Sequence, residues 1–186
     1  MPRSFSEQEI VRRESLQQLI DLGLDPYPAE LFEINNTSKK IKENYKQDNP
    51  LECVIAGRIM SKRIMGKASF VEIQDSEGRI QLYLNRDEIC PGEDKRMYNT
   101  VFKKLLDIGD IIGVKGTVFT TKVGEISIKV KELKILTKSL QPLPLPKLDA
   151  DGAMHDSFTD PEKRYRQRYV DLIVNPYVKE TFVKRT

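Results

Sequence analysis

Several residue types are scarce in this chain, and each shortage argues against a class of function. The 186 residues include no tryptophan, a single histidine and two cysteines. Cys53, Cys90 and His155 lie far apart in sequence, so neither a zinc-ligand spacing nor a cysteine–histidine nucleophile pair is indicated. No apolar run approaches the roughly 18–20 residues that span a bilayer. We therefore expect no metal and no membrane contact, and a reduced, cytoplasmic setting for the two thiols.

The chain also lacks a strong excess of either charge. Lysine and arginine total 31 and aspartate and glutamate total 28, for a net charge of +3. Any contact with nucleic acid must therefore come from a local patch of basic residues. One such patch exists, because no acid interrupts the segment that holds Arg58, Lys62, Arg63 and Lys67.

Two short alternating segments joined by a glycine turn follow this basic segment. Side chains in a strand alternate between faces, so each segment has one apolar face for a core. The other face carries Phe70 in the first segment, and Gln81 and Tyr83 in the second. An aromatic ring on the wet face of a sheet beside cations favours stacking on an unpaired base. The pattern alone fits equally well an inert sheet face on which Phe70 packs under a loop.

Other periodic segments predict a mainly β domain with helices at its N-terminal side. Ser6 and Glu9 have the spacing of a capping box and predict a helix over 7–22. Its apolar stripe comprises Ile10, Val11, Leu16, Leu19, Ile20 and Leu22, and its other face, with Arg12, Arg13, Gln17 and Gln18, is either solvated or an aid to phosphate binding. A second short helix is expected from Thr37 or Ser38 to about Tyr45.

From Leu51 onward the period of the apolar residues is two. It predicts strands over about 51–62, 68–75, 79–85, 110–121 and 125–136, with a helix in the insert 87–109. Five short strands with a helix between the third and fourth, and glycines at bends, predict a five-stranded OB-fold Greek-key barrel. The face of strands 2 and 3 in that fold binds oligonucleotides, although a barrel that binds a protein partner, or has no ligand role, fits the same pattern.

Proline then marks a boundary. The alternating prolines of 141–146 predict an extended connector, and 147–160 read as a flexible linker. A helix should begin at Pro161, capped by Thr159 or Asp160, with Tyr165, Tyr169, Leu172 and Ile173 on one stripe, and end before Pro176. A further helical pattern stops at Thr186 without a cap. The expected organisation is a helical extension (1–50), a barrel (51–140), a linker (141–160) and the truncated start of a second domain (161–186).

Three blocks of sequence together resemble one family. They are AGRIMSKRIMGKASFVEIQDSEGRIQLY, GDIIGVKGTVFTTKVGEISIKVKELKILTKSL and RYRQRYVDLIVN, and the earlier RRESLQQLIDLGLDPYP is similar to the family's first helix. They look like the N-terminal anticodon-binding region of bacterial-type class II lysyl-tRNA synthetases. The resemblance covers nearly the whole chain, with the blocks in the family's order.

The resemblance implies roles for individual residues. Phe70 would stack on an anticodon base, Gln81 would contact the central uridine, and Arg63 would bond to that base's edge or its phosphate. Glu125 would read the third anticodon base, since a carboxylate accepts from the ring N–H of uracil, which cytosine lacks. Arg58, Lys62, Lys67 and Lys122 would supply supporting phosphate contacts.

The resemblance also implies a whole enzyme that activates lysine with ATP and magnesium, transfers it to tRNA-Lys and acts as a homodimer. Its catalytic machinery is expected beyond Thr186, so this chain has no expected catalytic residue or cofactor of its own. A free-standing module that binds single-stranded nucleic acid is the alternative. The unfinished second domain after the proline-rich connector favours the synthetase.

Overall fold

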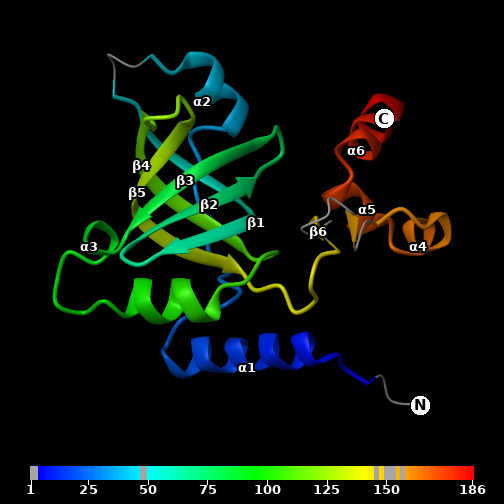
Figure 1. Cartoon of the computed structure of the whole chain (residues 1–186), viewed down its shortest axis with the longest axis horizontal. Helices are drawn as coiled ribbons and strands as arrows, with labels where there is room; N and C mark the ends of the chain where they lie inside the picture. The colour runs from blue at the N-terminus through cyan, green and yellow to red at the C-terminus, as the bar shows by residue number, and fades with distance from the viewer. Residues whose placement is uncertain (1–3, 47–49, 145–146, 149–153, 156–157) are drawn as a thin grey trace. The chain divides into compact units, whose positions relative to one another are not determined.

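The computed structural model of the protein describes residues 4–46, 50–144, 147–148, 154–155 and 158–186. The chain forms two compact units, Met1–Gln141 and Pro142–Thr186 (Figure 1). The expected N-terminal extension, 1–50, therefore belongs to the same unit as the barrel. Within the described part of the chain, no helix is both long and apolar enough to cross a membrane.

Five strands close into a barrel in the first unit. They are β1 (Glu52–Met65), β2 (Ala68–Gln74), β3 (Arg79–Asn85), β4 (Ile111–Thr120) and β5 (Ile126–Thr137). Their order around the ring is β1-β2-β3-β5-β4, and β1 pairs with β4 to close it. β3 and β5 run parallel, and the other pairs are antiparallel. This confirms the predicted five-stranded barrel.

The barrel interior is filled by the apolar residues of each strand's alternation. Ile55, Ile73, Leu82, Ile112 and Ile128 contribute from the five strands and are completely buried. Helices cover the two ends in Figure 1, with η1 (Met97–Leu105) at one end and α2 (Ser38–Asn44) at the other. Their buried residues Tyr98, Phe102 and Ile41 join the same core cluster. The predicted inward faces of strands 2 and 3 are thus confirmed.

Two glycines meet demands that other residues cannot. At Gly116, where a bulge shifts the register of β4 against β5, a Cβ atom would lie 2.2 Å from the Lys129 carbonyl oxygen. Gly124 has a φ of 86° in the β4–β5 turn, a left-handed conformation that disfavours residues with a Cβ. The first glycine lets β4 approach β5 closely, and the second sets the hairpin that carries Glu125.

The insert between β3 and β4 forms two helical elements. The short α3 (Arg86–Ile89) precedes η1, which is wound more widely than an α-helix. The Leu106 N–H donates to the Val101 carbonyl at 2.9 Å, five residues back. The Tyr98 hydroxyl shares a 2.8 Å hydrogen bond with buried Ser69 of β2. The predicted helix in the insert is confirmed, and the structure shows that it is a π-helix.

Helix α1 (Glu7–Asp21) begins at the predicted residue, ends one residue before the predicted end, and has the predicted capping box. The orientation expected from its apolar stripe is wrong. Only Leu19 of that stripe is buried, whereas Ile10, Val11, Ile20 and Leu22 are exposed. Arg12 is buried instead, because its guanidinium donates to the Ile108 carbonyl (2.8 Å) and the Ser139 carbonyl (3.0 Å). These two backbone carbonyls need hydrogen-bond donors, and Arg12 supplies them. The helix is therefore rotated so that Arg12, and not the apolar stripe, is buried.

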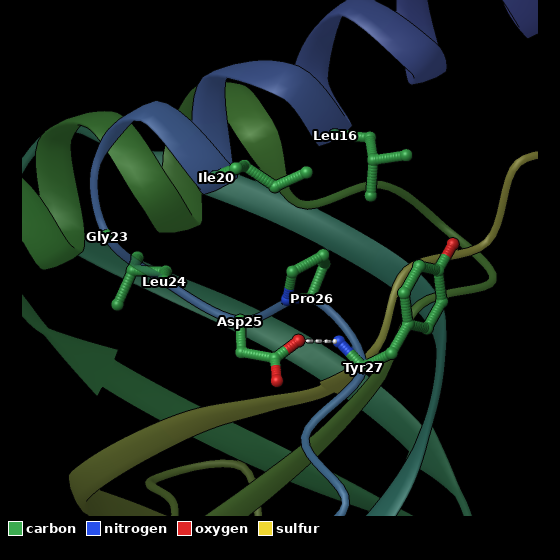
Figure 2. A pocket seen from close by; sticks show the side chains of 7 residues that line it. All are labelled: Leu16, Ile20, Gly23, Leu24, Asp25, Pro26 and Tyr27. Atoms are coloured by element: carbon green, nitrogen blue, oxygen red, sulfur yellow. Dashed lines mark hydrogen bonds between the residues drawn. The ribbon is translucent and has the colours of Figure 1, made fainter.

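The exposed part of the α1 stripe borders an apolar hollow on the first unit. Figure 2 shows Leu16 and Ile20 projecting from α1 on the side of Pro26 and Tyr27. Asp25 is the one acid in its lining, and its Oδ1 accepts from the Tyr27 N–H at 2.8 Å. This carboxylate is therefore used within the turn, and the hollow offers apolar surface with little else.

A buried ion cluster ties the ends of several elements together. Lys138 and Asp110 are both fully buried, and the Lys138 Nζ lies 2.9 Å from Asp110 Oδ2 and 2.5 Å from Asp107 Oδ2. Asp110 also accepts from the backbone N–H groups of Asp107 and Ser139, both at 2.7 Å. The Lys138 carbonyl accepts from the Tyr27 hydroxyl at 2.9 Å. This cluster joins the start of β4, the end of β5 and the segment after α1.

The second unit contains short elements. β6 (Lys147–Leu148) pairs with β7 (Met154–His155) inside the stretch expected to be a linker. The other residues of 145–157 lie outside the described part. α4 (Pro161–Arg166), capped by Asp160 as expected, is followed by α5 (Arg168–Val174) and α6 (Pro176–Arg185).

The single helix predicted between Pro161 and Pro176 is wrong, because the chain breaks at Gln167. Of the predicted stripe, Tyr165 and Tyr169 are exposed, whereas Leu172 and Ile173 are partly buried. The packing centre of these helices is buried Asp171, which accepts from Arg164 Nε (3.0 Å), Asn175 Nδ2 (2.7 Å) and Arg168. Burial raises the pKa of Asp171, but the hydrogen bonds from Asn175 and Arg164, together with the charges of Arg164 and Arg168, leave the pKa below its ordinary value.

Replacing Asp110 tests the buried cluster. Asp110→Ala leaves the Lys138 ammonium buried with one carboxylate fewer, so the free energy of unfolding should fall by about 3–5 kcal/mol. Denaturant unfolding followed by circular dichroism measures the change. Glu132→Ala is the matched control, because its exposed pair with Lys115 should contribute only about 0–1 kcal/mol. Equal losses in the two variants would contradict a structural role for the cluster.

Candidate nucleic-acid interface

The strand register places Arg63, Phe70 and Tyr83 side by side on the outside of the barrel. Arg63 of β1 is paired with Phe70 of β2, and Phe70 is paired with Tyr83 of β3. Directly paired residues project from the same face of a sheet. Val71 and Leu82, their neighbours in sequence, are buried in the interior. The predicted outward position of Phe70 is therefore confirmed, and an exposed guanidinium lies beside it.

Three aromatic rings form a connected group on this face. The centroids of Phe70 and Tyr83 are 5.3 Å apart with the planes tilted by 53°. The centroid of Phe119, from β4, lies 6.0 Å from that of Tyr83 in an edge-to-face arrangement. Such contacts hold the rings in place. Phe70, at one end of the group and only partly buried, can offer ring surface to an added base.

Gln81 lies in the adjacent row of the same face. It is paired with Ser127 of β5, and its Nε2 donates to the Ser127 hydroxyl at 2.9 Å. The Ser127 hydroxyl donates in turn to the Glu125 carbonyl at 3.4 Å. On its other side Gln81 is paired with Glu72, which forms an ion pair with Arg79 at 3.1 Å. The neighbouring acid is thus compensated, and the carboxamide is held from the β5 side.

Glu125 sits at the end of the β4–β5 turn with an exposed side chain. Its backbone N–H donates to the Thr121 hydroxyl at 3.0 Å. Its carboxylate lies 3.9 Å from the ammonium of Lys42 on α2, an exposed pair that fixes the side chain only weakly. α2 itself is held firmly, because the Ser38 hydroxyl donates to Asp75 Oδ1 at 2.7 Å.

Lys62, expected to contact phosphate, has a different role in the structure. It is paired with Val71, so it shares the inward face, opposite to that of Arg63. Its Nζ donates to three carbonyls at the end of η1, those of Phe102 (3.1 Å), Lys103 (3.3 Å) and Leu106 (2.6 Å). Desolvation by burial lowers the Lys62 pKa. An ammonium has three N–H donors, and all three serve the helix end.

The other expected phosphate contacts differ in exposure. Arg58 is half-buried and its Nη1 donates to the Gly109 carbonyl at 2.7 Å, with burial lowering its pKa. Lys67, in the β1–β2 turn, and Lys122, in the β4–β5 turn, are exposed. Lys67 and Lys122 are therefore the better placed of the four to meet a phosphate.

The sequence reasoning missed Phe119, Ser127 and Lys42. The alternation of β4 and β5 places Phe119 and Ser127 on the outer face, so that part of the signal was available. Their proximity to Tyr83 and Gln81 follows only from the β3–β5–β4 pairing. No local pattern in the sequence indicates that Lys42 lies near Glu125.

A closed five-stranded barrel with aromatic, amide and guanidinium groups on its β1–β2–β3 face is the arrangement of an OB-fold nucleic-acid-binding domain. Residues 53–136 match the tRNA anti-codon family model, whose description is an OB-fold nucleic acid binding domain. This agrees with both the predicted fold and the predicted binding class.

The whole chain is also similar to lysine–tRNA ligases. It is 59% identical to that of Christiangramia forsetii over 99% of this chain, and 60% identical to that of Porphyromonas gingivalis over 98%. The lysine–tRNA ligase of Azobacteroides pseudotrichonymphae is 58% identical over 98%. The chain spans about a third of the length of these relatives (32–36%). Nearly the whole chain is therefore similar to part of the bacterial lysine–tRNA ligases, and its barrel matches the OB-fold domain of the tRNA anti-codon model.

Replacing Lys62 separates its helix-end contacts from phosphate binding. Lys62→Met removes a charged donor from three carbonyls, so the free energy of unfolding should fall by about 1.5–3 kcal/mol. The exposed Lys67→Met is the matched control and should change it by less than about 0.5 kcal/mol. Urea denaturation of both variants measures the difference. A Lys62→Met protein as stable as the control would show that these contacts contribute little.

Proposed function

We propose that this chain reads the anticodon loop of tRNA-Lys on behalf of a lysine–tRNA ligase. The observation that supports this most directly is the partly exposed Phe70 ring on the barrel's outer face, paired with Arg63 and close to Gln81. Proteins that read single-stranded RNA stack unpaired bases on aromatic rings and read base edges with polar side chains. This face provides both kinds of group within three adjacent strands.

Each residue has one role in this proposal. Phe70 stacks on a splayed anticodon base, with Tyr83 supporting its ring from β3. Gln81 contacts the pairing edge of the central uridine, and Arg63 bonds to that base or its phosphate. Glu125 accepts from the ring N–H of the third base, a uridine. A carboxylate near a phosphate backbone repels it, so Glu125 lowers affinity unless it recognises a base.

The electrostatic contribution comes from the edge of the site. Lys67 and Lys122, in the turns that flank it, supply phosphate contacts, and Arg58 adds a partly buried charge. Lys62 is left out because its donors are engaged at η1. With a net charge of +3 for the whole chain, binding should depend on these few cations and fall as salt rises.

The activity of the whole protein is part of the same proposal. It would be a class II lysine–tRNA ligase that consumes ATP with magnesium, acts as a homodimer and works in the cytoplasm, where it meets its tRNA. Among the described residues, no three histidine, cysteine, aspartate or glutamate side chains gather to hold a metal ion. In this proposal no described residue carries out a catalytic step, and the chain by itself is inactive.

Binding of RNA stem-loops tests the anticodon site. The chain should bind a stem-loop with the anticodon UUU more tightly than one with UCU, measured by fluorescence anisotropy at fixed salt. Phe70→Ala should weaken binding of the UUU stem-loop by about 1–3 kcal/mol, because a stacked base loses its ring. Phe5→Ala, which removes an exposed ring from the N-terminal segment, is the control and should leave affinity unchanged. Equal affinity for both stem-loops would contradict anticodon reading.

Replacing Glu125 tests the reading of the third base. In Glu125→Ala the carboxylate that accepts from the uracil N–H is gone, so the preference for UUU over UUC should fall by about 1–3 kcal/mol. The preference for UUU over UCU should remain, because Gln81 is unchanged. Competition binding with the three stem-loops gives both ratios. Loss of both preferences together would indicate that Glu125 supports the site as a whole.

A further inference from the structure

Ser127 is a buried hydroxyl between two proposed readers of the anticodon. It lies on the outward face of β5 and has no exposed surface. Gln81 of β3 is paired with it on one side, and Phe119 of β4 on the other. A buried hydroxyl must have hydrogen-bond partners to offset the loss of water. Those partners are Gln81 Nε2, at 2.9 Å, and the Glu125 carbonyl, at 3.4 Å.

The hydroxyl of Ser127 has a single hydrogen, and the acceptor of that hydrogen decides how the Gln81 carboxamide is oriented. A serine hydroxyl has one hydrogen to donate and lone pairs with which to accept. The Glu125 carbonyl can only accept, so the hydroxyl hydrogen goes to it. The lone pairs that remain favour the N–H side of the Gln81 carboxamide over its carbonyl side. Nε2 is therefore held toward Ser127, and Oε1 is on the other side of the amide plane.

The orientation of Gln81 matters because its two ends suit different bases. In the part of the chain that the structure describes, Oε1 has no hydrogen-bond partner, and the side chain is partly exposed beside Phe70. A carbonyl oxygen accepts from the ring N–H of uracil. Cytosine has an unprotonated ring nitrogen at that position, which would face the oxygen with its own lone pair. A flipped amide would reverse this preference.

We propose that Ser127 is a positioning residue that gives the central-base site its selectivity for uridine over cytidine. It acts through Gln81, which it holds with the carbonyl toward the base, and it does not touch the RNA. The proposal rests on the proposed anticodon function and adds to it the reason why this amide selects one pyrimidine.

Ser127→Ala removes the acceptor that holds Nε2 and leaves the carboxamide free to turn. The ratio of affinities for UUU and UCU stem-loops should fall by about three- to tenfold, as expected for one net hydrogen bond. Affinity for UCU should hold or rise, because Phe70 and Arg63 remain in place. A merely structural role would instead lower both affinities together. Thermal melting establishes that the variant is folded.

Three further variants sharpen the test. Ser61→Ala is the matched control, because Ser61 lies in the same row of the face, beyond Glu72, and is exposed. Its UUU to UCU ratio should equal that of the unmodified chain. Gln81→Glu places an acceptor at both ends of the side chain, so in that background Ser127→Ala should leave the ratio unchanged. Ser127→Thr, which keeps the hydroxyl, should restore most of the ratio lost in Ser127→Ala.

The outcomes distinguish this inference from the function on which it rests. If the unmodified chain binds UUU and UCU equally, the anticodon proposal fails, and the role of Ser127 fails with it. If the unmodified chain discriminates and Ser127→Ala discriminates equally well, the role of Ser127 is overturned and the anticodon proposal stands. A ratio that falls equally in Ser61→Ala, or that falls again in the Gln81→Glu background, also overturns it.

Discussion

The parallel pairing of β3 with β5 is the constraint on which the rest of this site depends. Together with the β1–β4 pairing it completes the ring, and it places Gln81 opposite Ser127 and Tyr83 opposite Lys129. Without it the outer face of β1, β2 and β3 would be an open sheet, and the amide of Gln81 would lack its hydroxyl partner. On the other side of β5, β4 approaches closely, which the missing Cβ of Gly116 permits. The same strand pairing therefore helps to form the barrel and orients the Gln81 side chain, which we propose contacts the anticodon.

Many of the chain's basic residues are committed to the fold. Lys138 neutralises Asp110 where β4 begins and β5 ends, Lys62 serves the carbonyls at the end of η1, and Arg12 holds α1 to two carbonyls. Helix and strand ends leave backbone acceptors that need donors, and burial makes unmet acceptors costly. The cations proposed to meet RNA are few: Arg58 and Arg63 on β1, and Lys67 and Lys122 in turns. A small net charge is therefore compatible with a localised RNA-binding face.

The sequence predicted correctly the features that depend only on the spacing of side chains along one helix or strand. Alternation identified the outward position of Phe70 and Gln81, and the capping box identified the start of α1. The prediction from sequence was wrong where hydrogen bonds between distant residues, and not the pattern of apolar residues, decide which side chains are buried. α1 turns its arginine inward, and the helix after Pro161 breaks at Gln167 to pack around Asp171. Lys62 was read as part of a basic patch, although its position next to Arg63 in a strand already placed the two on opposite faces.

Three properties could be obtained from the amino-acid sequence alone: the five strands, the apolar face of each strand, and the resemblance that the comparisons bear out. Those properties follow from side-chain spacing along an extended backbone and from residue identity, which need no knowledge of distant contacts. Only the tertiary structure decided which outward residues meet. Three strands, with residues up to 46 positions apart, contribute Gln81, Ser127 and Phe119. Lys42 reaches Glu125 from helix α2. Strand order and register are properties of the closed ring, because they depend on how all five strands pack together.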